Sequence, residues 1–322
     1  MRKGKIAVIG GSGFIGTELV RSLVREKRDV VIVDKKTSDQ FPDLWKNADV
    51  RDEKSLLKAL KGCSVIYNLA AEHKDNVQPP DLYDDVNITG ARNVCTAAEV
   101  AGIKTIIFTS TVAVYGFVER ETDENGEINY FNDYGRTKYE AEKVYKNWFK
   151  RGKDRKLVII RPTVVFGEKN RGNVYNLFRQ VTSGKFLMIG SGRNKKSMAY
   201  VENVAGFLSH VLSLENGEHL FNYIDKPDFD MNTLVRTIKT KLGKGCKRVF
   251  HFPYFLGYLG GIFFDLLSAL SGKEFSVSRV RVKKFCSNTI FYSSKIGATG
   301  FKPKVSLEEG INRTIESEFM NQ

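Results

Sequence analysis

Short apolar runs alternate with helical patterns along the first half of the chain. The runs are KIAVIG, DVVIVD, SVIYNLA, KTIIFTST and KLVIIRP, and each is almost continuously apolar. Strands with this composition are typically covered on both faces of a sheet. Between them, residues 14–27, 52–61, 82–101 and 133–151 carry apolar residues at helical spacing. The alternation predicts an α/β fold with a doubly wound parallel sheet and a ligand crevice at the carboxyl ends of its strands.

The second half of the chain reads as two interleaved parts. Residues 166–199 have the pattern of loops and one helix of a smaller unit. Residues 200–224 give one more helix and strand, which we expect to return to the main sheet. The tail from about residue 225 reads as irregular. We therefore predict a sheet domain of residues 1–165, joined by the returning segment, and a smaller C-terminal domain of residues 166–199 and 225–322.

A long apolar segment, FPYFLGYLGGIFFDLLSAL, lies within this tail at residues 252–270. It reaches the length of a membrane span, but Pro253, three glycines and Asp265 interrupt it. We expect a buried or interfacial helix, with peripheral membrane attachment as the alternative. The basic residues that flank it are Lys244, Lys247, Arg248 and Lys273.

The composition indicates a folded protein with an excess of positive charge. A chain of 322 residues with 42% hydrophobic residues can bury a sizeable core. The formal net charge of +14 is compatible with nucleic acid, an anionic membrane or a phosphorylated substrate as partner. No nucleic-acid-binding motif accompanies the charge, so we expect no nucleic acid partner and favour a solvated basic face.

Cysteine and histidine usage predicts neither disulfides nor a metal site. The four cysteines, Cys63, Cys95, Cys246 and Cys286, have no CxxC spacing, which favours reduced thiols. The four histidines are equally scattered. The N-terminal residues pass directly into the first strand without a secretory leader pattern, so a cytoplasmic location is expected.

A glycine-rich turn, VIGGSGFIG, follows the first predicted strand and opens the first helix. It places Gly10, Gly13 and Gly16 at three-residue spacing, with Phe14 and Ile15 between the last two. Glycines there permit a tight turn, let backbone amides approach a pyrophosphate and allow close helix packing. No Gly-Lys-Ser/Thr follows, so the turn is not a P-loop. We expect these residues to bind a dinucleotide in a Rossmann-type domain.

The second predicted strand ends at Asp34, where an acidic residue would receive the two hydroxyls of the adenosine ribose. A carboxylate there repels a 2′-phosphate, so NAD is the expected cofactor. Lys35, which we include among the cofactor-binding residues, and Lys36 soften that preference and keep NADP as the alternative.

With these residues in view, the chain resembles the extended short-chain dehydrogenase/reductase family, specifically its epimerases, dehydratases and reductases of nucleotide sugars. The motifs, in order, are GGSGFIG, ADVRD, NLAA, VNITGARNV, FTSTVAVYG, YGRTK, RPTVVFG and MAYVENVA. The resemblance covers most of the chain and implies a substrate-binding role for the smaller domain; a homodimer is the expected assembly. It also implies further cofactor-site residues: Asp49 and Val50 at the adenine, Leu69, Ala70 and Ala71 along the channel, and Asn87 in support of the active site.

Tyr134 and Lys138 stand four residues apart on a predicted helix, so their side chains share one face. The resemblance implies that Thr111 holds the substrate hydroxyl, Tyr134 moves its proton, and Lys138 binds the nicotinamide ribose, so that Tyr134 and Lys138 also contact the cofactor. A free phenol ionises near pH ~10, so a base at neutral pH needs nearby positive charge. We expect this group to be catalytic.

Dehydratases resembling this chain carry an Asp-Glu pair after the Ser/Thr, and this sequence has Val112 and Ala113 there. Neither side chain transfers a proton, so we expect hydride transfer without loss of water.

The substrate side resembles the family more loosely. Asn173 stands where nucleotide-sugar enzymes touch the diphosphate or sugar, and Lys196 stands where many have an arginine for phosphate. Arg281 is a further phosphate candidate by its position and charge. For all three, a solvated surface residue is the competing interpretation.

Together these residues predict an NAD(P)-dependent epimerase or 4-keto reductase that acts on a nucleotide-linked sugar and serves surface polysaccharide synthesis. A hydroxysteroid-type or other lipid-alcohol dehydrogenase is the alternative enzyme, because the apolar segment is atypical of soluble epimerases. A regulator that binds the dinucleotide without turnover is the alternative from another class.

Overall fold

The computed structural model describes residues 4–74, 77–243, 250–271 and 278–320. Cys246 and the four basic residues flanking the apolar segment lie outside the described residues. Cys63 and Cys95 are buried free thiols, and Cys286 is a partly buried one.

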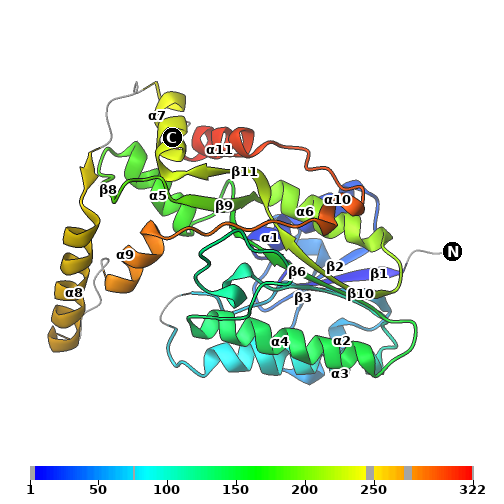
Figure 1. The fold of residues 1–322 in the computed structure, drawn as a ribbon. Helices are drawn as coiled ribbons and strands as arrows, with labels where there is room; N and C mark the ends of the chain where they lie inside the picture. The colour runs from blue at the N-terminus through cyan, green and yellow to red at the C-terminus, as the bar shows by residue number, and fades with distance from the viewer. Residues whose placement is uncertain (1–3, 75–76, 244–249, 272–277, 321–322) are drawn as a thin grey trace.

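A seven-stranded parallel sheet forms the centre of the molecule, in the order β10-β6-β5-β4-β1-β2-β3 (Figure 1). Its strands are β1 (Lys5–Ile9), β2 (Val30–Asp34), β3 (Trp45–Asn47), β4 (Cys63–Asn68), β5 (Thr105–Thr109), β6 (Lys156–Pro162) and β10 (Gly217–Tyr223). The strand order reverses between β1 and β4, and ligands bind outside the carboxyl ends of the strands at such a point. The predicted doubly wound parallel sheet is therefore confirmed.

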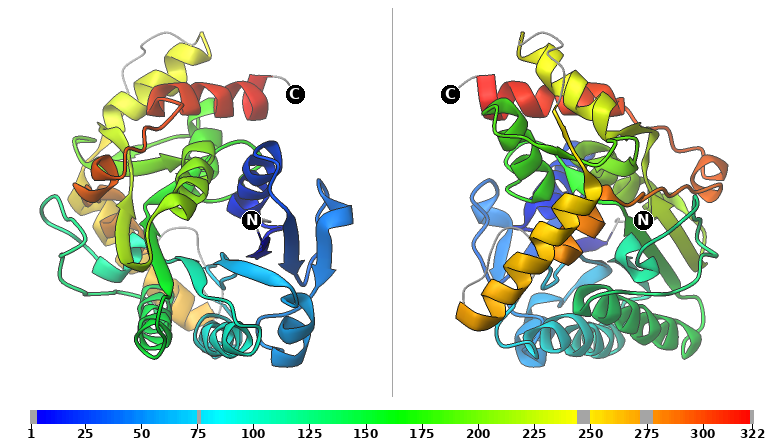
Figure 2. Two further views of the ribbon diagram at one scale, coloured as in Figure 1. Left: turned by 90° about the vertical axis from the view of Figure 1, so that its right-hand side faces the viewer. Right: turned by 60° about the vertical axis from the view of Figure 1, so that its left-hand side comes forward.

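Helices cover both faces of this sheet because successive residues of each strand point to opposite sides. Ile6 and Val8 pack in one core with α1 (Phe14–Arg25) and α6 (Val201–His210). Ala7 and Ile9 pack in a second core with α2 (Glu53–Ala59), α3 (Gly90–Val100) and α4 (Asp133–Lys150). Figure 2 shows α3 and α4 side by side along their face of the sheet.

A second, smaller unit sits on the carboxyl side of the main sheet. Its strands form one sheet of β11 (Asp225–Asp230), β9 (Lys195–Tyr200) and β7 (Val164–Phe166), and a two-stranded sheet of β12 (His251–Phe252) and β8 (Met188–Ile189). Its core joins residues of β7 and β9 with α5 (Asn173–Thr182), α7 (Met231–Lys241) and α11 (Leu307–Ile315). The remaining helices are α8 (Tyr254–Ser271), α9 (Arg279–Cys286), α10 (Lys295–Ala298), η1 (Pro42–Leu44), η2 (Asp84–Thr89), η3 (Val112–Tyr115), η4 (Val211–Ser213) and η5 (Glu316–Met320).

The segment at residues 200–224 joins the main sheet. Strand β10 pairs in parallel with β6 along its whole length, and α6 packs against α1. Most of the remaining tail packs with the smaller unit, whereas Ile296 and Phe301 pack against a core of the main sheet. We keep the two-domain division as a proposal on this basis.

The prediction of a tail that is irregular apart from the helix in its apolar segment is wrong, because the described residues also form the α-helices α7, α9, α10 and α11 there. Asp230 caps α7 by accepting a hydrogen bond from the Thr233 amide (2.6 Å), and Ser306 caps α11 in the same way. Short helices of this kind depend on their caps and on a narrow apolar face, which lysines and threonines obscure in the sequence pattern.

The apolar segment of the tail is the helix α8, which projects from the body of the molecule (Figure 1). Among the described helices, none is long and apolar enough to cross a membrane.

We expect Phe207→Ala to lower the free energy of unfolding by about 3–5 kcal/mol, because truncating a buried aromatic ring leaves a cavity. The ring is fully buried on α6 and lies 5.2 Å from Tyr223 and 5.1 Å from Phe301, so it joins the sheet to the tail. Val100→Ala, at an exposed position of α3, should change stability by less than about 0.5 kcal/mol. Urea denaturation measures both, and a loss below about 1 kcal/mol for Phe207→Ala would contradict this account.

Candidate active site

Close backbone contacts in the glycine turn between β1 and α1 leave no room for a side chain at Gly10 and Gly16. Gly10 has φ +77°, and a Cβ there would lie 2.6 Å from the Ala70 nitrogen. A Cβ at Gly16 would lie 2.3 Å from the Gly10 carbonyl oxygen. Gly13 is the N-cap of α1 and provides no side-chain cap, so the first amides of the helix, including those of Phe14 and Ile15, are open to a ligand. This arrangement suits a pyrophosphate at the helix N-terminus.

Asp34 lies at the carboxyl end of β2, directly beside this turn. Its carboxylate accepts hydrogen bonds from the backbone amides of Ser12 (3.1 Å) and Lys36 (3.0 Å). The side chain is thereby fixed next to the glycines, and the exposed Lys35 follows it. The residues present fit the dinucleotide predicted from the sequence, with Asp34 as the acceptor for the ribose hydroxyls.

The loop after β4 completes the wall of this crevice. Leu69 donates its backbone N–H to the Ile9 carbonyl (2.9 Å), and Ala70 lies against Gly10. Ala71 follows in the same loop and is half-buried. Contact of these three residues with the cofactor stays a prediction.

The two residues expected at the adenine, Asp49 and Val50, differ in their surroundings. Val50 is buried and packs against Gly90, where an added Cβ would lie 2.9 Å from it. The Asp49 carboxylate accepts hydrogen bonds from the Arg51 side chain at 2.7–3.2 Å, and this lowers the pKa of Asp49. A role of Asp49 at the adenine stays a prediction.

Asn87 ties the crevice to the helix that carries the tyrosine. Its side-chain oxygen accepts from the Glu72 amide (2.9 Å), and its nitrogen donates to the Glu72 carbonyl (3.0 Å) and the Thr137 hydroxyl (2.9 Å). Asn87 is buried, so these bonds hold the loop after β4 against α4. This geometry supports the positioning role that the sequence predicts.

Thr111, Tyr134 and Lys138 meet at the carboxyl end of β5. Thr111 is the N-cap of η3, where its hydroxyl oxygen accepts from the Ala113 amide (3.1 Å). Its side chain also lies near the phenol of Tyr134, in the first turn of α4, and acts to lower the pKa of that phenol. The structure thus places the hydroxyl and the phenol on neighbouring elements, η3 and α4, with Lys138 one turn further along the helix.

Lys138 is almost completely buried, and its ammonium lies 4.2 Å from the centre of the Phe108 ring. Burial lowers the pKa of Lys138 to about 7, although the nearby Glu142 carboxylate opposes the shift. Burial raises the pKa of the Tyr134 phenol to about 12, with the Thr111 side chain opposing it. A proton acceptor at neutral pH therefore requires positive charge brought to the phenol by the cofactor and Lys138.

Sequence analysis missed the buried ion pair beneath this group. Glu142 is fully buried on α4 and accepts from the Arg161 guanidinium of β6 at 2.8 and 2.6 Å. It also accepts from the Ser110 hydroxyl at 2.5 Å. Glu142 follows Tyr134 and Lys138 at the same four-residue spacing, and that stripe was the signal in the sequence.

Gly135 is a second residue that sequence analysis missed. A Cβ there would lie 2.6 Å from the Ala113 carbonyl oxygen, so only glycine lets the first turn of α4 approach η3 this closely. A glycine inside an amphipathic helix pattern was the available signal.

The three candidate substrate-binding residues have different surroundings. Asn173 is the exposed first residue of α5. Arg281 is exposed on α9. The Lys196 ammonium donates to the carbonyls of Lys284 (2.9 Å) and Ser287 (2.6 Å) at the end of α9, and burial lowers its pKa to about 8. Lys196 therefore fastens α9 to β9 in this structure, and phosphate binding by these three residues stays a prediction.

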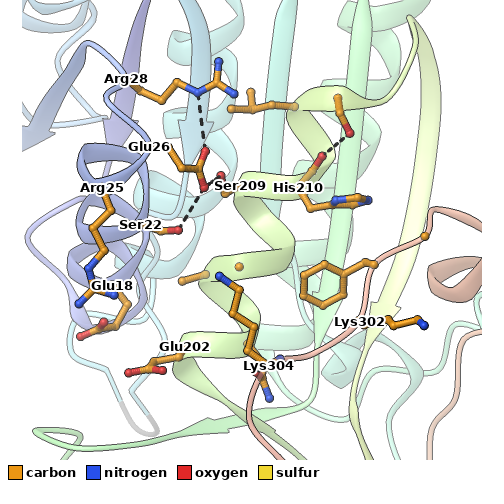
Figure 3. Close-up of a pocket in the computed structure, with 17 residues that line it drawn as sticks. Glu18, Ser22, Arg25, Glu26, Arg28, Glu202, Ser209, His210, Lys302 and Lys304 are labelled. Carbon is orange, nitrogen blue, oxygen red and sulfur yellow. Dashed lines mark hydrogen bonds and ion pairs between the residues drawn. The ribbon is translucent and has the colours of Figure 1, made fainter.

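A cavity of about 630 Å³ lies away from this group, between α1, α6 and the tail near Phe301 (Figure 3). Among its charged groups, Glu26 accepts from Ser209 (2.7 Å) and lies 3.6 Å from Arg28. We assign it no ligand. In the described part of the chain, no group of three or more His, Cys, Asp or Glu side chains converges to hold a metal ion.

Comparison with known proteins gives three findings. The model of the NAD dependent epimerase/dehydratase family matches residues 6–223. The N-acetyl-alpha-D-glucosaminyl-diphospho-ditrans,octacis-undecaprenol 4-epimerase of Escherichia coli O157:H7 is 46% identical, over 98% of this chain and 96% of that protein. A decarboxylating sterol-4-alpha-carboxylate 3-dehydrogenase of Saccharomyces cerevisiae is 30% identical, over 96% of both chains.

Solved structures match in fold. The UDP-glucose 4-epimerase of Thermotoga maritima, with UDP-glucose, has a TM-score of 0.76 at 24% identity and covers 97% of this chain and 98% of its own. The UDP-N-acetylglucosamine 4-epimerase of Methanobrevibacter ruminantium has a TM-score of 0.77 at 21% identity and covers 100% of both chains.

We expect this protein to bind NAD(H) more tightly than NADP(H), because the Asp34 carboxylate repels a 2′-phosphate. Asp34→Ala should reduce that preference at least about tenfold. Asp29→Ala, at an exposed position just before β2, is the matched control and should leave the ratio unchanged. Titration calorimetry with both cofactors measures the ratio of their affinities. A wild-type preference for NADP(H) would show that Asp34 does not discriminate between the two cofactors.

The lowered pKa of Lys138 predicts a pH-dependent stability. The folded-state pKa is about 7 and the unfolded value is about 10.4, so between them the unfolded chain binds more protons. Stability therefore rises with pH across this window, and below about pH 7 the cost of burying the ammonium is fully present. Lys138→Met should raise the free energy of unfolding by roughly 1–3 kcal/mol near pH 6, and the gain should shrink toward pH 10.

Denaturation at several pH values measures this difference. Lys104→Met, at an exposed position, should show no such trend. A difference between Lys138→Met and wild type that stays constant with pH would mean that Lys138 does not titrate as described.

Proposed function

The chain belongs to the NAD dependent epimerase/dehydratase family, and we propose that it is a 4-epimerase of an N-acetylated sugar carried by a polyprenyl diphosphate. The observation that carries the proposal is the 46% identity, over 98% of this chain, to an enzyme whose name specifies that substrate. Family membership confirms three predictions from the sequence: the extended short-chain dehydrogenase/reductase resemblance, enzymatic activity of the epimerase type, and NAD as the cofactor.

The carrier of the sugar is where the proposal goes beyond the sequence-based prediction, which named a nucleotide. Two relatives at 30% identity or more are named for an undecaprenol-linked sugar and a sterol, and both substrates have large apolar parts. The exposed apolar helix α8 of this chain is in keeping with a substrate of that kind. A nucleotide sugar remains the comparison substrate for the test.

In this proposal each residue of the catalytic group has one task. Tyr134 takes the proton of the sugar 4-hydroxyl and later returns it, while Thr111 holds the same oxygen through its hydroxyl. Lys138 supplies positive charge that favours the phenolate. NAD, which the glycine turn and Asp34 would hold, would supply a hydride acceptor and donor, so that hydride removed from one face of the sugar carbon could return to the other.

The two residues after Thr111 favour a reaction without loss of water. Val112 and Ala113 lie in η3 directly after Thr111 and have no group that titrates. Elimination needs one base beside the carbonyl and one acid at the leaving hydroxyl. We therefore propose a reaction that returns the hydride without dehydration, and net consumption of NADH would instead indicate the 4-keto reductase.

The setting of the enzyme is proposed in the same terms. We propose a homodimer, with no nucleic acid partner, that works on the cytoplasmic side in peripheral contact with the membrane that holds its substrate. Light scattering tests the assembly separately from the reaction.

The direct test incubates the purified protein with detergent-dispersed N-acetylglucosaminyl-diphospho-undecaprenol and with UDP-N-acetylglucosamine. The sugars are then released by acid and separated. We expect the 4-epimer from the lipid-linked sugar, without net change in NADH and without water loss. Tyr134→Phe should slow the reaction about 10²–10⁴-fold with NAD affinity nearly unchanged, because one oxygen is lost and the ring stays.

Tyr130→Phe, which removes an exposed phenol just before α4, is the matched control and should retain activity. Conversion of the nucleotide sugar alone would reject the lipid carrier. Full activity of Tyr134→Phe would reject the catalytic assignment, and oxidation of a sterol alcohol with net NADH formation would favour the alternative dehydrogenase.

A further inference from the structure

The helix α8 presents a stripe of large apolar side chains to solvent. Its members and their exposed fractions are Phe255 61%, Leu259 55%, Phe263 58%, Leu266 59% and Leu270 86%. At about 100° of rotation per residue, these five positions fall within an arc of about 80°. A contiguous exposed apolar surface of this kind marks an interaction site.

The opposite side of α8 packs against the body of the protein. The stripe is therefore exposed because of the side on which the helix is held. Gly257 and Gly261 are buried. An added Cβ at Gly257 would lie 2.7 Å from the Ile189 side chain, and one at Gly261 would lie 2.7 Å from the Arg279 nitrogen. The glycines let α8 sit directly on β8 and on the start of α9. The helix is thus held with its apolar stripe exposed. Figure 1 shows α8 at the side of the molecule.

The neighbouring helix α9 supplies positive charge beside this stripe. Arg279, Arg281 and Lys283 are exposed, whereas Val282 between them is buried. The Arg279 amide donates to the Asp265 carboxylate of α8 (3.2 Å), which joins the two helices. An apolar stripe next to exposed arginine and lysine is complementary to the acyl boundary and the headgroups of an anionic lipid surface.

Helix α9 also connects α8 to the catalytic group. The Lys283 ammonium lies 5.2 Å from the Phe117 ring centre, and that of Lys284 lies 5.5 Å from the Phe131 ring centre. The two rings contact each other at 4.7 Å, and Phe131 lies three residues before Tyr134. Anything that α8 and α9 bind is therefore held close to the segment that leads into the catalytic helix.

We propose that α8 and α9 form a docking element that seats the protein on the surface of an anionic phospholipid bilayer. The apolar stripe of α8 enters the boundary between headgroups and acyl chains, and the cations of α9 bind the phosphates. A second copy of the chain fits this surface less well, because a two-fold contact through α8 would bring the basic α9 helices of both copies together. The docking itself does not depend on the proposed function. The further statement that docking delivers a lipid-linked substrate to the site rests on the proposed function.

The experiment is co-sedimentation of the full chain with vesicles, without substrate. We expect binding to phosphatidylglycerol-containing vesicles, weaker binding to phosphatidylcholine vesicles, and loss of binding at high salt. Leu259→Glu with Phe263→Glu should weaken binding at least tenfold. Arg279→Glu with Lys283→Glu should weaken binding to anionic vesicles by roughly fivefold per removed cation and abolish the preference for them.

Val100→Glu, which places the same charge at a site on α3 that is 70% exposed, is the matched control and should bind as wild type does. Phe263→Trp gives a second measurement that does not depend on a disruptive change. Its fluorescence should shift to the blue on addition of anionic vesicles.

Wild-type protein that does not sediment with anionic vesicles would overturn the proposal, as would α8 variants that bind normally or a Phe263→Trp spectrum that does not move. If light scattering instead showed that Leu259→Glu with Phe263→Glu converts a dimer to a monomer, while wild type ignores vesicles, the stripe would be a subunit interface. Because no substrate is present, failure here leaves the epimerase test in detergent unaffected.

Discussion

The buried ion pair between Glu142 and Arg161 is the interaction on which the geometry of the catalytic group depends. It fastens α4 to β6 at two oxygens, and the Ser110 hydroxyl joins the same carboxylate from the end of β5. Both charged side chains are almost completely buried, so removal of one partner would leave an uncompensated charge in the core. The ion pair and the Ser110 bond therefore fix the position and rotation of α4 relative to β5 and β6. This placement sets where Tyr134 and Lys138 point.

The electrostatics of the site follow from that placement. Mounted this tightly, α4 buries Lys138 against Phe108 and shields the Tyr134 phenol, so burial lowers the pKa of the lysine and raises that of the tyrosine. Neither group carries charge readily by itself at the pH where it has to work. A cationic nicotinamide ring beside Tyr134 would therefore lower the pKa of its phenol. This response distinguishes a catalytic tyrosine and lysine from two residues that only share a helix face.

Features that depend on local sequence could be predicted, whereas those that depend on long-range contact could not. The sheet, the glycine turn and Asp34 follow from periodicity and from a fixed spacing along the chain. Arg161 lies 19 residues from Glu142 along the chain and reads as part of a buried strand, so nothing local identifies their contact. Lys196 shows the converse, because its charge suggested a phosphate ligand while the fold uses its ammonium to cap α9. Apart from α8, the tail helices were missed because their caps are single residues in a lysine-rich pattern.

The central claim is that Tyr134, on the helix held by the Glu142–Arg161 ion pair, becomes a base only when the oxidised cofactor is present. The most direct measurement is the phenolate absorbance of wild type minus Tyr134→Phe, followed against pH with and without NAD⁺. This account predicts that the Tyr134 phenol titrates near pH 12 without cofactor and at clearly lower pH in the NAD⁺ complex. A titration of Tyr134 that does not move when NAD⁺ binds would contradict it.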